Sequence, residues 1–208
     1  EMQLSAFEEV DQTFSNILGS SYERHVSASA PALILEKAHF DFCRVGISLY
    51  GFWPSSLTRV SFLSQKSKLI DLKPVMSWMT KLASLRHIKA GTAVSYGCTY
   101  IASSDMKVAV LPVGYYEGYP RAASSSGAYV LCQGKRCQIV GRICMNMMVI
   151  DVSHLENPVL GELVTLIGRD GKELIRAEDL AGWAGTIQYE IVTRILPQVP
   201  RVLGYLKK

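Results

Sequence analysis

Apolar side chains near the start of the chain recur every three or four positions. They are Leu4, Phe7, Val10, Phe14, Ile17 and Leu18. This spacing places them on one face of an amphipathic helix, so we predict a helix over residues 4–18. Gly19 follows the last apolar position and is a plausible end for that helix.

The pattern then changes to an alternation of short elements. Residues 22–29 are predicted to form a strand that runs into a loop. Residues 31–38 have the length and apolar content of a short helix, with Pro31 in its first turn. Residues 42–52 (FCRVGISLYGF) are rich in β-branched and aromatic side chains, which indicates a second strand. The order helix, strand, helix, strand is that of an α/β unit.

Beyond Pro54 the chain favours strands almost throughout. The strand-like runs are 60–72, 75–88, 92–101, 107–115, 128–132, 138–152 and 163–167. Turn signals rich in glycine, asparagine and proline separate them. Only residues 177–184 (AEDLAGWA) favour a helix in this part of the chain. The pattern therefore predicts the end of an α/β domain, up to residue 57, followed by a mostly β domain.

Composition narrows the class of protein. Of the 208 residues, 49% are apolar and 19% are charged, which is enough for a packed core and excludes a disordered chain. The net charge of +4 comes without a basic cluster, so a nucleic-acid partner is not expected. No apolar run reaches the roughly 18 residues of a membrane span. Five scattered cysteines, an odd number, favour free thiols in a reducing cytoplasm.

Three short stretches combine flexible backbone with phenols or arginine. They are residues 95–97 (SYG), 114–121 (GYYEGYPR) and 141–146 (GRICMN). Loops at strand ends commonly display binding groups, but a single tyrosine more often covers a sheet and hydrogen-bonds locally. No metal-ligand cluster, glycine-rich phosphate loop or nucleophile elbow is present in the sequence. These residues alone leave open whether the protein is an enzyme.

Seven segments, taken in order, indicate a resemblance to a known family. They are HVSASA at 25, DFCRVGISLYG at 41, AGTAVSYGCTY at 90, LPVGYYEGYPR at 111, IVGRICMNMMVIDVS at 139, IQYE at 187 and VPRV at 199. In this order and at these spacings they resemble the C-terminal half of alanine racemase, a pyridoxal-phosphate enzyme. The resemblance implies an α+β chain. Residues 1–57 would be the last βα units of a TIM-type (β/α)8 barrel, and residues 58–208 the C-terminal β domain of the family. A complete barrel needs about 250 residues, so most of it is absent from this chain.

The resemblance also implies a reaction and its partners. Alanine racemases interconvert L- and D-alanine in the cytoplasm and supply D-alanine for peptidoglycan. Their active site is shared between the two subunits of a homodimer, with no nucleic acid or membrane involved. Tyr96 matches the tyrosine that acts as one of two bases on opposite faces of the substrate. The second base, a lysine that also binds the cofactor covalently, lies in the missing part of the barrel, so we expect this chain alone to be inactive.

Several residues match the positions that bind pyridoxal phosphate in the family. Arg44 matches the arginine that faces the pyridine nitrogen, where a guanidinium can only donate a hydrogen bond and leaves the nitrogen unprotonated. His25 matches a histidine that hydrogen-bonds this arginine. The cofactor phosphate would be held by two side-chain hydroxyls and two backbone amides, those of Ser29, Gly46, Ile47 and Tyr189. Ala28 stands where many members of the family have asparagine.

Other matches concern the substrate. Met145 and Tyr115 correspond to residues that the partner subunit places beside the substrate carboxylate. Three more positions, Arg121, Arg142 and Ile187, correspond to the family's access channel, where positive charge would attract a carboxylate. Asn146 and Glu117 stand where the family more often has aspartate, so charge-dependent contacts at those positions are in doubt.

Two alternatives stay open at this point. The first is a racemase of another amino acid such as serine, which residues of the missing barrel would decide. The second is a non-catalytic β domain that serves oligomerisation and binds no pyridoxal phosphate.

Overall fold

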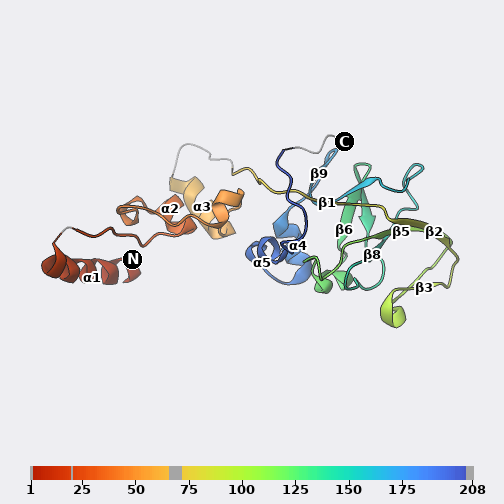
Figure 1. Ribbon diagram of the computed structural model, residues 1–208, viewed down its shortest axis with the longest axis horizontal. Coiled ribbons are helices and arrows are strands. Elements are labelled where there is room, and N and C mark those ends of the chain that lie inside the picture. The colour runs from red at the N-terminus through yellow and green to blue at the C-terminus, as the bar shows by residue number, and fades with distance from the viewer. Residues whose placement is uncertain (1, 20, 66–71, 205–208) are drawn as a thin grey trace. The chain divides into compact units, whose positions relative to one another are not determined.

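The computed structural model describes residues 2–19, 21–65 and 72–204. The chain forms two compact units, Glu1–Val75 and Met76–Lys208 (Figure 1). This boundary lies further along the chain than the division expected at residue 57. The difference arises because the segment after Pro54 continues the first unit as a helix, and because the Val75 amide donates to the Tyr50 carbonyl at 3.2 Å.

The first unit is helical wherever it has regular structure. Its elements are α1 (Met2–Leu18), α2 (Ser29–Ile34), η1 (Glu36–Ala38), η2 (Ile47–Tyr50) and α3 (Ser56–Gln65). The helix expected over residues 4–18 is confirmed. That expected over 31–38 is shorter and ends in a 3-10 turn.

The two strands expected at 22–29 and 42–52 do not form. These segments are extended and run in the same direction, joined by Asp41 N–H to Arg24 carbonyl at 3.1 Å and Arg44 N–H to Ser27 carbonyl at 2.9 Å. A parallel ladder needs evenly spaced bonds along both strands, and these two bonds do not provide one. The apolar end of the second segment curls into η2 instead.

The strand expected at 60–72 is also wrong for its described part. Residues 60–65 belong to α3, and residues 66–71 lie outside the described part of the chain. Thr58 and Phe62 are four residues apart and share the buried face of the helix. The Phe62 ring packs against Trp53 with a centroid distance of 5.4 Å. This spacing is that of a helix.

The second unit is mostly β with some helices, as expected for residues beyond 75. Its largest sheet has the strand order β1-β9-β6-β7 with β10 on β9, a second has the order β2-β5-β8, and β3 pairs with β4. The strands are β1 (Trp78–Lys81), β2 (Ser84–Ile88), β3 (Ala93–Val94), β4 (Tyr100–Ile101), β5 (Met106–Leu111), β6 (Tyr129–Cys132), β7 (Lys135–Gln138), β8 (Met148–Asp151), β9 (Leu163–Asp170) and β10 (Glu173–Ile175). The other elements are η3 (Tyr96–Cys98), η4 (Arg121–Ser125), α4 (Ala177–Ala184) and α5 (Gln188–Arg194).

Several expected strands are interrupted. The run 75–88 divides because the Leu82 amide binds the Glu162 carbonyl whereas the Ala83 amide binds the Val110 carbonyl, so the chain changes sheet between these two residues. The run 138–152 is a strand only near its two ends, at Gln138, the last residue of β7, and in β8. The preceding residues form an irregular segment, called here the 139–147 loop.

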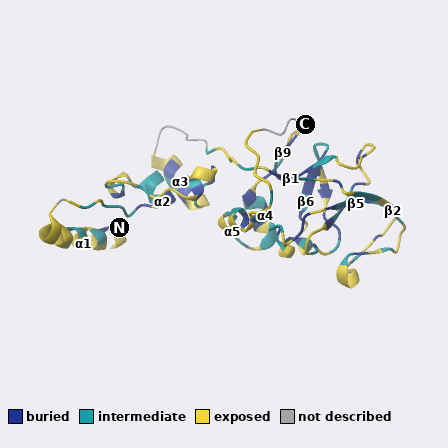
Figure 2. Ribbon diagram, in the orientation of Figure 1, coloured by how far each residue is buried: buried dark blue, intermediate teal, exposed yellow. Residues whose placement is uncertain are grey.

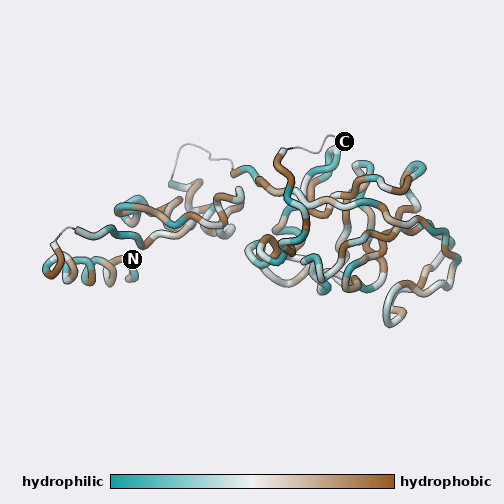
Figure 3. Tube along the Cα trace, in the orientation of Figure 1, coloured by the Kyte–Doolittle hydropathy of each residue, from teal (hydrophilic) through white to brown (hydrophobic). Residues whose placement is uncertain are grey.

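The core of the second unit lies where the sheets and α4 meet (Figure 2). Met148 and Ile150 alternate inward on β8 and are fully buried, as is Leu180 on α4. Apolar and polar positions are interspersed along the trace (Figure 3), and β6 and β9 carry runs of consecutive buried residues, as strands covered on both faces do. The core therefore fixes the strand ends from which the site loops project.

Candidate functional site

Tyr96 lies on an exposed turn at the end of β3. The backbone has a positive φ at three residues that flank Tyr96, namely 65° at Ser95, 74° at Gly97 and 48° at Cys98. The Tyr96 side chain is 75% exposed, so it does not cover its own sheet. Residues other than glycine that have a positive φ are strained, and such strain is held only where surrounding contacts over-determine it.

Those contacts come from the 139–147 loop. The Ser95 hydroxyl donates to the Arg142 carbonyl at 2.5 Å and lies 3.5 Å from the Cys144 thiol. Gly97 faces the Arg142 guanidinium so closely that a Cβ atom there would meet Nη1 at 2.7 Å. The turn that carries Tyr96 is thus packed against a loop almost fifty residues further along the chain.

The same loop brings Met145 beside Tyr115. The Tyr115 amide donates to the Cys144 carbonyl at 3.1 Å and the Tyr116 amide to the Met145 carbonyl at 2.7 Å. Gly114 makes this approach possible, because a Cβ atom there would stand 2.2 Å from the Cys144 carbonyl oxygen. The Met145 and Tyr115 side chains are both exposed. The loop therefore joins three of the predicted site residues, Tyr96, Tyr115 and Met145.

Glu117 has a local role in this arrangement. Its carboxylate accepts a hydrogen bond from the Gly114 amide at 2.7 Å, and its carbonyl accepts one from the Leu196 amide at 3.1 Å. It therefore closes the 114–117 turn and ties it to the segment after α5. The carboxyl group at this position serves the backbone of the turn.

Tyr189 lies on α5, whose N-cap is Ile187. A groove of 590 Å³ runs between this helix and the segment that follows Tyr115. Arg121 lines it, together with Glu190 and Arg194, which form an ion pair at 2.7 Å. Tyr119 is buried beneath the groove, and burial raises the pKa of its phenol. The groove adjoins one predicted substrate residue, Tyr115, and one predicted channel residue, Arg121.

Three of the four residues predicted to hold a phosphate, Ser29, Gly46 and Ile47, meet in the first unit, whereas Tyr189 belongs to the second. Ser29 begins α2 and is buried, and its Oγ accepts a hydrogen bond from the Gly46 amide at 2.9 Å. Ile47, the next residue, begins η2, and among the described residues its amide has no recorded acceptor. The Ser29 hydroxyl proton and the Ile47 amide are donors that a phosphate could use. The donor set therefore fits a phosphate group.

Arg44 and His25 are near each other in the extended segments but do not bond. Arg44 is exposed, and its backbone amide, rather than its guanidinium, makes the recorded hydrogen bond. The His25 ring stacks on Phe42 at 4.5 Å, and its buried Nδ1 has no partner among the described residues. Among the described residues the expected hydrogen bond from His25 to Arg44 is not formed, and the His25 ring contacts Phe42 instead.

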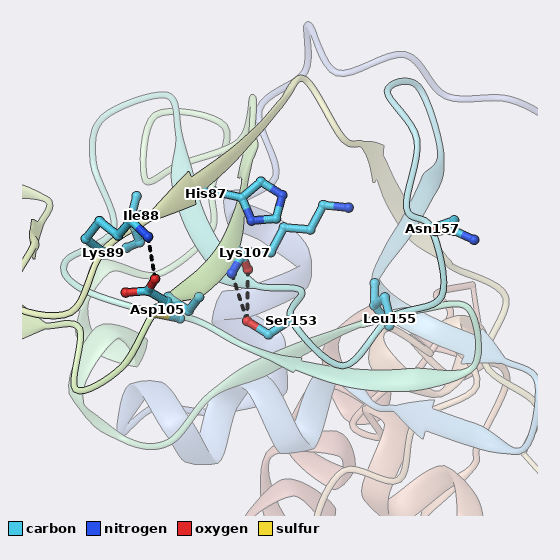
Figure 4. A pocket seen from close by; sticks show the side chains of 9 residues that line it. His87, Ile88, Lys89, Asp105, Lys107, Ser153, Leu155 and Asn157 are labelled. Carbon is cyan, nitrogen blue, oxygen red and sulfur yellow. Dashed lines mark hydrogen bonds and ion pairs between the residues drawn. The ribbon is translucent and has the colours of Figure 1, made fainter.

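A second groove, of 510 Å³, contains none of the predicted site residues (Figure 4). His87 and Lys107 are directly opposed on β2 and β5 at its floor. Lys89 pairs with Asp105 at 2.6 Å. Because none of the predicted site residues lines it, this groove is not the candidate site.

Comparison with known proteins places the chain in a family. A family profile described as "Alanine racemase, C-terminal domain" matches residues 75–203, which is more than half of the chain. The chain belongs to the alanine racemase family. It is 43% identical over 202 residues to an alanine racemase of Leptospira interrogans, covering 97% of this chain and 52% of that protein. An alanine racemase of Halothermothrix orenii is 42% identical over 178 residues, which are 86% of this chain and 45% of the relative.

Solved alanine racemases share the fold. The enzyme from a D-cycloserine-producing Streptomyces lavendulae superposes with a TM-score of 0.85 at 36% identity, over 98% of this chain and 52% of that one. The Bacillus anthracis enzyme, solved with bound L-Ala-P, gives a TM-score of 0.84 at 34% identity, over 93% and 48%. The chain thus spans about half the length of the alanine racemases it matches.

Some contributors to the site were not predicted from the sequence. Ser95 and Gly141 carry no ligand-binding chemistry, yet both contact the backbone that holds Tyr96 in place. The signal was present in the glycines of the 114–121 and 141–146 stretches. It could not be interpreted without knowing that these segments touch.

Among the described residues, no helix is both long and apolar enough to cross a bilayer.

Proposed function

We propose that this chain forms the C-terminal half of a pyridoxal-phosphate-dependent alanine racemase that interconverts L- and D-alanine and supplies D-alanine for peptidoglycan. Family membership supports the activity. The observation that carries the proposal is the exposed Tyr96 phenol, presented on a strained turn by a loop that also holds Met145 against Tyr115. An exposed, rigidly mounted phenol is what a base needs if it serves the active site of a neighbouring subunit.

The barrel remnant is part of the same proposal. Two extended segments of the first unit run parallel and are connected through α2, which is the arrangement of consecutive barrel units. A parallel strand in a closed barrel has a neighbour on each side, and the described residues supply only one. We therefore assign residues 1–57 to the end of the barrel, with helix α3 continuing the same unit, and the residues after Val75 to the β domain.

Ser29, Gly46, Ile47 and Tyr189 would hold the phosphate of the cofactor. Bound pyridoxal phosphate would withdraw electrons from the substrate α-carbon and so acidify its hydrogen. Arg44 would face the pyridine nitrogen, where a guanidinium can donate a hydrogen bond but cannot protonate the ring. The Ser29 hydroxyl is already oriented by the Gly46 amide, which reduces the entropy lost on binding.

Tyr96 would take or return the substrate α-hydrogen from one face. A free phenol has a pKa of about 10, so a nearby cation in the assembled site would be needed for work near neutrality. A lysine of the barrel would act from the other face. The active site would be completed in a homodimer, with Tyr96, Tyr115 and Met145 of one subunit reaching the cofactor of the other.

The test is a chimaeric racemase in which this chain replaces the 202 residues of the Leptospira interrogans relative with which it aligns. The chimaera should bind pyridoxal phosphate, racemise alanine and restore growth of a strain that requires D-alanine. Tyr96→Phe should abolish the growth, whereas the exposed neighbour Tyr116→Phe should not. A folded chimaera that binds no cofactor would overturn the proposal and favour an oligomerisation domain. A chimaera that racemises only serine would overturn the proposal that alanine is the substrate.

A further inference from the structure

We propose that Ser95 is a positioning residue for Tyr96. Its side chain fastens the turn that carries the phenol to the 139–147 loop and so fixes the direction from which the phenol reaches the substrate. This inference rests on the proposed racemase function. It concerns a residue that carries no binding or catalytic chemistry of its own.

The phenol cannot fix its own direction. The Tyr96 side chain is 75% exposed, and among the described residues no hydrogen bond of its hydroxyl is recorded. Its position within this chain therefore depends on the backbone on either side. That backbone is strained, because Ser95 has φ of 65°, a conformation that residues with a Cβ atom seldom adopt. Without an external contact the turn would relax to other conformations.

Ser95 supplies that contact. Its hydroxyl donates to the Arg142 carbonyl at 2.5 Å, a bond that spans 47 positions of the sequence. The hydroxyl also lies 3.5 Å from the Cys144 thiol. The bond is formed only while Ser95 keeps its strained conformation, since the side chain must point to the 139–147 loop. The hydroxyl therefore stabilises the conformation in which Tyr96 is presented.

Two glycines complete the attachment, one on each partner. A Cβ atom at Gly141 would lie 2.7 Å from the Val94 carbonyl oxygen and 2.8 Å from Ser95 Cβ. At Gly97, on the other side of Tyr96, a Cβ atom would lie 2.7 Å from the Arg142 guanidinium. The turn therefore makes close contacts with the 139–147 loop on both sides of Tyr96.

The attachment also relates Tyr96 to the substrate residues. The same 139–147 loop binds the backbone at Tyr115 and Tyr116 through the carbonyls of Cys144 and Met145. The 139–147 loop consequently positions both the proposed base, Tyr96, and the proposed carboxylate site. Loosening Ser95 should impair proton transfer by Tyr96 more than it impairs substrate binding.

The experiment compares Ser95→Ala with Ser126→Ala in the chimaeric holoenzyme. Ser126 is the matched control because its hydroxyl also donates to a backbone carbonyl, that of Ala123 at 3.0 Å, but within another turn. In D₂O, exchange of the α-hydrogen should slow at least tenfold for one enantiomer of alanine in Ser95→Ala, through kcat with little change in KM. Exchange for the other enantiomer should persist, because the lysine serves it. Equal slowing for both enantiomers, or no slowing, would overturn the proposal.

A second pair of variants tests the attachment without activity. Gly141→Ala and Gly127→Ala have almost the same φ, 74° and 76°, but only Gly141 has neighbours within 4 Å of the added Cβ atom. Amide hydrogen exchange at residues 95–98 of the 208-residue chain should accelerate in Ser95→Ala and Gly141→Ala and stay unchanged in Gly127→Ala. Unchanged exchange in the first two would refute the attachment. An inactive parent chimaera would instead count against the proposed function, and this measurement would still decide about Ser95.

Discussion

Replacing Gly114 by alanine should destabilise the second unit severely. Gly114 is buried, and an added Cβ atom would stand 2.2 Å from the Cys144 carbonyl oxygen, 2.5 Å from that of Met145 and 2.6 Å from the Met145 carbonyl carbon. All three atoms belong to the backbone, so no side-chain rotation can relieve the clash. The 139–147 loop and the 114–116 segment would have to separate by about 1 Å to reach ordinary van der Waals distance.

The loss of folding free energy follows from the interactions that this separation would break. The hydrogen bonds from the Tyr115 and Tyr116 amides, at 3.1 Å and 2.7 Å, would lengthen, and each contributes about 1 kcal/mol. Overpacking a well-filled site adds about 1–3 kcal/mol. We expect a total loss of about 3–5 kcal/mol, a large share of the roughly 5–15 kcal/mol by which domains are stable. For a unit of this size the melting temperature should fall by about 10 °C or more.

Urea unfolding of the 208-residue chain, followed by tryptophan fluorescence, measures this loss. Gly182→Ala is the matched control, because Gly182 lies within α4, is exposed and has no atom within 4 Å of an added Cβ. In a helix interior that change should stabilise by about 0.5–1 kcal/mol. A Gly114→Ala protein that unfolds within about 1 kcal/mol of the parent would refute the reasoning, since the two backbones would then be free to separate.

Further predictions concern single side chains. Tyr96→Phe in the chimaera should slow racemisation by about 10²–10⁴-fold. The loss in kcat/KM should be equal in both directions, because the two enantiomers have the same free energy. Polarimetry starting from each enantiomer measures both rates, and unequal kcat/KM values would contradict this expectation. Ser29→Ala should weaken pyridoxal phosphate binding by about 5–30-fold, through loss of a hydroxyl donor; absorbance titration of the apoenzyme measures it, and an unchanged Kd would remove Ser29 from the phosphate site. Tyr119→Phe should stabilise the chain by about 1 kcal/mol, because the buried hydroxyl has no partner among the described residues. Burial raises the pKa of Tyr119, so this phenol ionises at lower pH in the unfolded chain than in the folded one. The parent should therefore lose folding stability as the pH rises above about 10. Denaturation at pH 9 and pH 11 should show a smaller loss of stability for Tyr119→Phe than for the parent, and an equal loss would contradict this account.

The sequence predicted the elements whose pattern is local. The apolar spacing between Leu4 and Leu18 matches α1, and the strand-rich character beyond residue 75 matches the second unit. It failed where tertiary partners decide the conformation. Residues 42–52 have strand composition, but with so few parallel hydrogen bonds from their neighbour they remain irregular and end in η2.

The candidate site shows the same division. Motif matches identified Tyr96, Tyr115 and Met145, and the structure brings the backbones around them together through the 139–147 loop. The contacts that do so depend on the absence of a side chain at Gly114 and Gly141 and on a hydroxyl at Ser95. A glycine in a sequence does not reveal which backbone approaches it, so these supports could be found only in three dimensions.

Main-chain carbonyls and the buried side chain of Ile143 hold residues 142–146 of the 139–147 loop in place, and this has a practical consequence for protein engineering. The side chains of Met145 and Asn146 are exposed, while the loop is secured through the carbonyls of Arg142, Cys144 and Met145. Residue type at positions 145 and 146 is thereby uncoupled from the path of the loop. A library randomised at these two positions should consist mostly of folded proteins.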